Sequence, residues 1–326
     1  MRIQPHVKNT FVLILVSALA YLPLVNQLGY NHDDWYLMAS ARAEGPGVFW
    51  QIFSVDRPLR ALVMIPAYHL FGENPLYYNL SAYIFRVLGA LALLWILRLL
   101  WQRHHTTTML MALLFLIYPG FLSQTNGLDY QSHIVGLAAA LLSIAFTLRA
   151  VLAEKRLSKL MLHAFSIVLG WLALGQMEWY IGIEFFRWAC VYVLSSRQAG
   201  TLLQKTWRTI QQAYPALAIP LFFLLWRILF FKGDRSATDV NIQFETLRLY
   251  PLQTAYHWTI QVLQDLFDVF FSAWVIPLSQ LIGYIQRWGG LLALITAGLV
   301  IFAVHVLKNT NSPNELARFD IYYEAL

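Results

Sequence analysis

Long apolar runs alternate with short polar turns along most of this chain. An uncharged apolar run of about 18 residues is long enough to cross a bilayer as a helix, and only helices or closed barrels satisfy their backbone groups there. The pattern therefore predicts an all-α polytopic membrane protein with about eight to nine spans, the runs at 107–122 and 269–285 being the weakest. The candidate spans cover residues 10–28, 76–101, 107–122, 133–152, 160–177, 179–195, 213–231, 269–285 and 290–307.

Composition supports this interpretation. Of the 326 residues, 59% are apolar and 12% are charged, and the mean hydropathy is +0.54. A soluble globular domain is about 45–50% apolar and about 25% charged, so a soluble enzyme is excluded. We expect one membrane domain over residues 1–308 and a polar tail over 309–326. The single cysteine, Cys190, excludes a disulfide scaffold and a cysteine-based zinc site.

The charged residues alternate in sign from turn to turn. Basic residues gather in every second turn, which is the positive-inside pattern of cytoplasmic loops. We therefore expect a multi-pass protein of the plasma (inner) membrane, with a cytoplasmic N-terminus and an acidic extracytoplasmic side. Basic cytoplasmic loops also account for the net charge of +6, so no nucleic-acid partner is expected. The basic turns hold Arg98, Arg103, Arg149, Lys155, Arg156, Lys159, Arg197, Lys205 and Arg208.

The first outer loop, between Leu28 and Pro75, is long. Its apolar segment Leu59–Phe71 contains Pro66 and is too short to cross about 30 Å of hydrocarbon. Together with Asp34–Ala43, this segment predicts helices that lie along the membrane surface.

Two adjacent carboxylates, Asp33 and Asp34, stand near the start of this loop. A carboxylate just above a span can have a raised pKa that suits a general base, or it can bind a divalent cation such as Mg²⁺ or Mn²⁺. The alternative is a solvated pair that caps a helix, with Trp35 and Tyr36 in an aromatic belt. On a helix the two side chains point about 100° apart, so one shared role is not expected.

Three further short motifs follow along the chain, and their order is informative. Residues 55–59 read V-D-R-P-L, residues 66–80 read P-A-Y-H-L-F-G-E-N-P-L-Y-Y-N-L, and residues 176–179 read Q-M-E-W. With the aspartates of the first outer loop, this order resembles the GT-C superfamily of membrane glycosyltransferases. That superfamily includes protein O-mannosyltransferases, aminoarabinose transferases and oligosaccharyltransferases. The resemblance is strongest over about residues 10–200.

The resemblance implies a GT-C-like helical bundle that transfers a sugar, with inversion, from a polyprenyl-phosphate donor to an extracytoplasmic protein, lipid or glycan. In that family an aspartate of the first outer loop is the catalytic base or part of a metal site, a role that falls on Asp33 or Asp34. The chain departs from the subfamilies compared at Tyr78 and at Gln176, where His and Lys are common near these positions. Many relatives continue past the polar tail, which indicates a short or a truncated member.

Other polar residues complete the predicted site, each with a structural alternative. Arg57 and Arg60 suit a donor phosphate, or else lipid headgroups. Glu178 and Asp129 suit the acceptor side. The cluster of Asp129 and His133 is either a catalytic group or a capped helix start, and Arg86 is either an intramembrane functional residue or an interfacial one. The substrate-binding candidates are Arg57, Arg60, Lys232, Arg235, Tyr78, Asp129, His133 and Glu178.

Two residue pairs have simple structural interpretations. Glu184 and Arg187 are three residues apart and predict an ion pair within one helix. Asp265 and Asp268 predict the polar face of a surface helix before the run at 269–285.

A second class of function is a secondary transporter or flippase for a lipid or sugar solute. Such proteins usually show internal repeats and charged residues near the middle of the membrane. Here no repeat is evident, and most acidic residues fall in the outer turns. The chain also lacks a G-x-G-x-x-G or P-loop motif for a nucleotide, so a sugar donor would reach the site from the bilayer.

Overall fold

The structure is a computed structural model that describes residues 5–118, 127–230, 240–285, 291, 294–302 and 305. Within these ranges every regular element is a helix and there is no strand. The predicted all-α fold is therefore confirmed for the described part of the chain.

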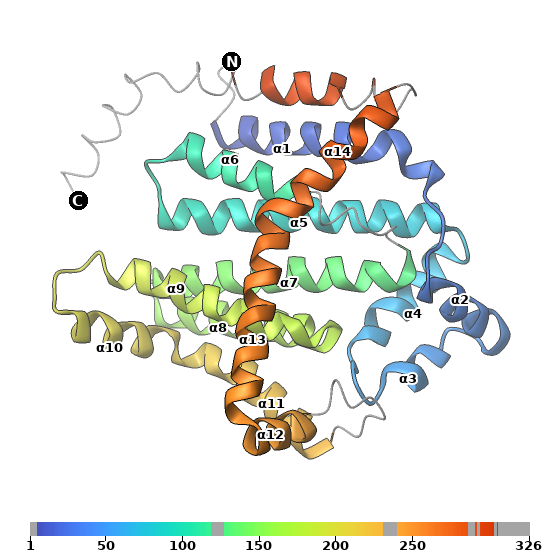
Figure 1. The fold of residues 1–326 in the computed structure, drawn as a ribbon. Coiled ribbons are helices and arrows are strands. Elements are labelled where there is room, and N and C mark those ends of the chain that lie inside the picture. The colour runs from blue at the N-terminus through green and yellow to red at the C-terminus, as the bar shows by residue number, and fades with distance from the viewer. Residues whose placement is uncertain are drawn as a thin grey trace.

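Helix α7 (Leu128–Val151) forms the centre of the bundle, packed between α5 (Pro75–Leu100) and α8 (Arg156–Gln176) (Figure 1). Small residues occur where α5 and α7 approach each other. Gly89 on α5 faces Ala138 on α7, and a Cβ added at Gly89 would lie 3.7 Å from the Cα of Ala138. The surrounding helices are α1 (Pro5–Tyr21), α6 (His105–Leu116), α9 (Ile183–Ser195), α10 (Leu202–Ala213) and α11 (Ala218–Phe230), with short 3₁₀ turns at Glu178–Gly182 and Tyr214–Leu217.

The segment between Leu28 and Pro75, which the sequence predicts as the first outer loop, folds into short helices at one end of this bundle (Figure 1). After the 3₁₀ turn Leu22–Gln27 come α2 (Asp33–Glu44), α3 (Val48–Phe53) and α4 (Arg60–Phe71). They enclose a core of their own, which includes Leu37, Phe49 and Met64. The helices predicted over Asp34–Ala43 and Leu59–Phe71 are thus confirmed, and none of them is long enough to span a membrane.

Six helical segments of the described chain are long and apolar enough to cross a membrane. They cover Thr10–Gln27, Pro75–Leu100, Leu128–Val151, Arg156–Gln176, Leu202–Phe230 and Pro251–Gln280. The predicted spans at 107–122 and 179–195 correspond to the shorter helices α6 and α9, and the one at 290–307 is only partly described. The count of eight to nine spans therefore stays a prediction.

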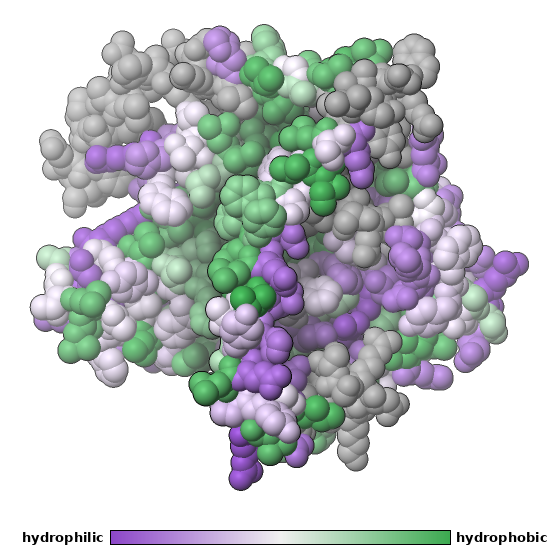
Figure 2. All heavy atoms as spheres, viewed as in Figure 1, coloured by the Kyte–Doolittle hydropathy of each residue, from purple (hydrophilic) through white to green (hydrophobic). Residues whose placement is uncertain are grey.

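The sequence predicts a surface helix that ends before the span at 269–285, but the structure shows one continuous helix there. After α12 (Val240–Leu249), a continuous helix runs through α13 (Pro251–Phe267), the π turn Asp268–Ser272 and α14 (Ala273–Ile285). Asp265 thus lies on this long helix rather than on a separate surface helix, because the π turn inserts a residue without ending the helix. In Figure 1 α13 runs across the direction of α1, α5 and α7, and Figure 2 shows hydrophilic and hydrophobic residues interspersed along it.

The two ends of the bundle differ in chemistry. The turns that follow α5, α7 and α9 meet at the end opposite α2 and α4 (Figure 1), and these are the turns that carry the basic residues. Arg197 in the last of them donates through Nη2 to the carbonyl oxygen of Leu99 at 3.1 Å, near the carboxyl end of α5, where a cation is favoured. The alternation found in the sequence therefore corresponds to a physical separation of charge along the bundle.

Candidate functional site

The adjacent aspartates differ in environment. Asp33 begins α2 and its side chain is exposed, whereas Asp34 is 1% exposed. Asp34 Oδ2 accepts the backbone N–H of Asn31 at 2.9 Å, and Oδ1 accepts that of Asp129 at 2.8 Å. Burial raises the pKa of Asp34, although the two N–H groups favour its charged form. Asp34 therefore joins the first outer loop to the start of α7, and Asp33 is left facing outward.

The contact between Asp34 and α7 depends on a glycine. A Cβ added at Gly127 would lie 1.9 Å from Asp34 Oδ2, far closer than two such atoms can approach. Gly127 is the residue that precedes α7, so the missing side chain leaves room for the carboxylate at the amino end of the helix, where a negative charge is favoured.

Arg60 and Asp129 form the next part of the cluster. Arg60 is 1% exposed, and its Nη2 donates to the carbonyl oxygen of Asp129 at 2.7 Å and to the Asp129 carboxylate. The guanidinium lies 4.5 Å from the centre of the Phe53 ring, and burial lowers its pKa below the usual value for arginine. Asp129 Oδ2 is also 3.6 Å from His133 Nε2. Arg60 is thus occupied by Asp129 and does not present its charge at the surface.

Arg57 and Glu178 form a bidentate pair at the edge of this cluster. Arg57 Nε donates to Glu178 Oε2 at 3.0 Å, and Nη2 donates to Oε1 at 3.1 Å. Burial alone would raise the pKa of Glu178, but the Arg57 guanidinium holds it below the usual value. Both side chains are part-exposed, so the pair lies where a ligand from outside can reach it.

The loop that carries Arg57 is docked on the end of α8. Leu59 fills a notch at Gly175, where an added Cβ would lie 2.4 Å from Leu59 Cγ. The next residue of α8, Gln176, donates through Nε2 to the carbonyl oxygen of Leu59 at 2.6 Å. This docking holds the loop segment that carries Arg57 next to the end of α8, which Glu178 follows by two residues.

Aromatic rings line the same region. His133 stacks on Tyr130 with ring centres 4.9 Å apart, and the Trp179 ring lies tilted at 57° to His133, also with ring centres 4.9 Å apart. The Tyr180 hydroxyl donates to the carbonyl oxygen of His133. Sequence reasoning missed Trp179 and Tyr180 as site residues, although they directly follow Glu178 in the sequence.

The remaining predicted residues lie elsewhere. The Tyr78 hydroxyl donates to the carbonyl oxygen of Gly72 at 2.7 Å, and its ring packs edge-on against Phe71, so this buried tyrosine supports the first outer loop rather than lining the cluster. Lys232 and Arg235 lie outside the described residues.

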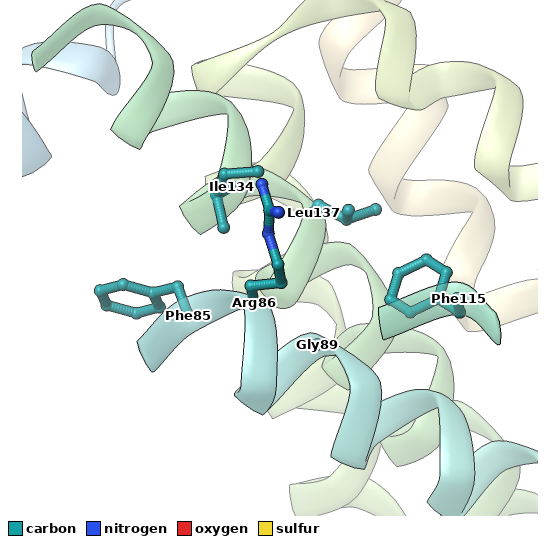
Figure 3. A pocket seen from close by; sticks show the side chains of 6 residues that line it. All are labelled: Phe85, Arg86, Gly89, Phe115, Ile134 and Leu137. Carbon is teal, nitrogen blue, oxygen red and sulfur yellow. The ribbon is translucent and has the colours of Figure 1, made fainter. Parts of the chain in front are cut away.

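Arg86 lies deeper in the bundle, on α5. Its guanidinium is 4.5 Å from the centre of the Tyr21 ring, and the residue is buried. Figure 3 shows the side chain reaching from α5 toward Ile134 and Leu137 of α7. Together with Phe85, Gly89 and Phe115, these residues line a small, mostly apolar cavity.

A metal site is not evident in the part of the chain that the structure describes. Within those residues, no three His, Cys, Asp or Glu side chains come close enough together to hold an ion. The candidate site contains an exposed carboxylate, two arginine–carboxylate pairs and a cluster of aromatic rings. In Figure 2, hydrophilic residues gather at the end of the bundle where α2, α4 and the start of α7 meet.

Comparisons with protein-family models, with curated proteins and with solved structures found no match for this chain.

Proposed function

We propose that this protein is a membrane glycosyltransferase that moves a sugar from a polyprenyl-phosphate donor to an acceptor outside the cytoplasm. The observation that carries the proposal is the convergence of Asp34, Arg60 and Asp129, and of Arg57 and Glu178, at the end of the bundle where α2 begins with the exposed Asp33. These residues come from distant parts of the chain and meet at one end of a membrane bundle. Such a gathering of ionisable groups is typical of functional sites.

In the proposed reaction the acceptor hydroxyl attacks the anomeric carbon from the face opposite the phosphate. The new carbon–oxygen bond forms as the bond from that carbon to the phosphate oxygen breaks, and the configuration is inverted. The acceptor proton passes to Asp33, because a general base must reach the proton it takes and Asp33 is exposed whereas Asp34 is only 1% exposed. The electron pair of the broken bond leaves with the polyprenyl phosphate.

Arg57 is the cation of the described cluster that we assign to the departing phosphate. It is more accessible than Arg60, which is buried against Asp129. A fixed guanidinium near the developing negative charge stabilises the transition state more than the ground state. Lys232 and Arg235 of the second outer loop are further candidates for this role.

The direct test offers purified protein in detergent two radiolabelled donors, a polyprenyl-phosphate hexose and the matching nucleotide sugar, each with crude membrane acceptors. We expect label to move to the acceptor only from the lipid-linked donor. Transfer from the nucleotide sugar without any lipid carrier, or no transfer from a panel of lipid-linked hexoses and pentoses, would contradict the proposal.

The proposal also requires α2 to lie outside the cytoplasm. Single cysteines at the exposed positions Ala39 and Gln198, each in a Cys190→Ala background, test this orientation. We expect the Ala39→Cys protein to react with an impermeant maleimide in sealed cells and the Gln198→Cys protein to react only after permeabilisation. The opposite pattern would overturn the orientation, and with it the extracytoplasmic site.

A further inference from the structure

Trp179 has an unusual setting for an exposed aromatic residue. It is 54% exposed, yet one side of the indole is held by His133, with ring centres 4.9 Å apart, and Tyr180 meets it edge-on at 6.5 Å. His133 is itself backed by the Tyr130 ring. The result is a cluster of aromatic rings from α7 and the turn Glu178–Gly182, with Trp179 as its exposed member.

The residue next to Trp179 in the chain carries hydrogen-bonding groups. Glu178 precedes Trp179 in the chain and pairs with Arg57 through two hydrogen bonds. An ionised carboxylate has about four lone-pair sites, so Glu178 keeps acceptor capacity after it has bound Arg57. Both side chains of the pair are partly accessible, with exposed fractions of 24% for Glu178 and 18% for Arg57.

An exposed flat ring beside a carboxylate and a guanidinium matches the chemistry of a pyranose. A pyranose has faces made of C–H groups and a rim of hydroxyl groups, so one face packs on an aromatic ring while the rim meets charged hydrogen-bonding groups. Pre-organisation matters for such a weak contact, because a ring that is already held in place loses little entropy when the ligand binds. The stack of His133 and Tyr130 supplies that pre-organisation here.

We propose that Trp179, with the Glu178–Arg57 pair, forms a subsite that binds a pyranose ring. The inference rests on the proposed function for its biological meaning, since it names where a sugar is held during transfer. The pyranose belongs either to the lipid-linked donor or to a glycan acceptor. An aromatic anchor for the membrane interface makes a different demand, because it requires an amphipathic ring at the headgroup level but no binding of a soluble pyranoside.

Two substitutions separate these demands. Trp179→Phe keeps an aromatic face, whereas Trp179→Leu keeps apolar bulk but has no ring. Trp207 is the matched control, because it is 59% exposed and belongs to α10, which begins at the end of the bundle opposite α2 and α4 (Figure 1). Thermal unfolding of each variant in the same detergent checks that the fold is retained.

Binding is measured without any turnover, by saturation-transfer NMR with methyl α-D-glucopyranoside and methyl α-D-mannopyranoside, and with sorbitol as the open-chain control. We expect the wild-type, Trp179→Phe and Trp207→Leu proteins to saturate the ring protons of at least one pyranoside. Trp179→Leu is expected to bind about threefold to tenfold more weakly, as suits the loss of one aromatic contact. Equal pyranoside binding by wild type and Trp179→Leu, or no binding by wild type, would overturn the subsite.

The transfer assay then identifies the source of the pyranose. A raised KM for the lipid-linked donor in Trp179→Leu, with the acceptor KM unchanged, assigns the subsite to the donor sugar, and the reverse assigns it to the acceptor. If the wild-type protein binds pyranosides through Trp179 but transfers no sugar, the subsite stands and the proposed glycosyl transfer fails.

Discussion

Replacing Arg187 by alanine is expected to lower the free energy of unfolding by about 3–5 kcal/mol, the usual cost of removing one partner of a buried ion pair. Arg187 has no exposed surface, and its Nε and Nη2 donate to the two oxygens of Glu184 at 2.7 and 2.9 Å. Without the guanidinium, the Glu184 carboxylate would be left buried and unpaired inside the bundle. Chemical unfolding in a mild detergent, followed by circular dichroism, measures the change.

The pair also holds three helices together. Arg187 on α9 donates to Thr147 and Ser143 on α7, at 2.6 and 2.8 Å, and to Ser166 on α8 at 3.0 Å. Loss of Arg187 does not strand these hydroxyls, because Ser143 and Ser166 also bond to each other's carbonyl oxygens. The expected loss of stability therefore comes mainly from Glu184.

A double substitution tests that assignment. Glu184→Leu combined with Arg187→Met removes both charges and is expected to recover most of the stability lost in Arg187→Ala, since apolar replacements of buried pairs are often neutral. Arg149→Ala, at an exposed position on α7, is the control and is expected to change stability by less than about 0.5 kcal/mol. If Arg187→Ala were no more destabilising than Arg149→Ala, the network would not contribute to the stability of the bundle.

The Asp33→Asn variant is expected to lose sugar transfer by about 100-fold to 10,000-fold, the range for removal of a general base. Asn is nearly the same shape but cannot accept the acceptor's proton. Because Asp33 is exposed at the start of α2, the substitution should leave the unfolding midpoint unchanged. The measurements are initial rates of transfer from the lipid-linked donor and thermal unfolding of the same samples.

Asp34→Asn is expected to behave differently. Both oxygens of Asp34 accept backbone N–H groups, from Asn31 and Asp129, and an amide offers only one oxygen. Its NH₂ group would face a second donor, which costs about 1–3 kcal/mol for a buried group left unsatisfied. Loss of stability should therefore accompany any loss of transfer in this variant.

The two variants together decide the roles. Full transfer activity in Asp33→Asn, with loss of activity but not of stability in Asp34→Asn, would reverse the assignment of the base. Wild-type activity in the double Asn variant would remove the first outer loop from the catalytic machinery altogether.

Local features were predictable from the sequence. The helices over Asp34–Ala43 and Leu59–Phe71 were predicted from apolar and polar spacing and correspond to α2 and α4. The pair Glu184–Arg187 followed from its three-residue separation on a helix. These features depend on neighbours in the chain, which the sequence displays directly.

Long-range partners were not predictable in the same way. Arg57 and Glu178 are 121 residues apart, and each was assigned to a different substrate before the structure paired them. Asp34 and Asp129, 95 residues apart, are joined because Gly127 leaves space at the start of α7, a fit that depends on helix packing. The continuous helix through Asp268 was missed because a π turn has no clear sequence signal. The catalytic and binding roles of the site residues stay predictions.

The docking of Leu59 on Gly175 has a consequence for the evolution of this chain. The two residues share one small volume, so neither position can change size independently of the other. In homologous sequences that keep the Arg57–Glu178 pair, a residue larger than glycine at position 175 should occur together with a smaller residue at position 59. Covariation of these two positions would then distinguish homologues that dock this loop on α8 from those that share only the pattern of apolar runs.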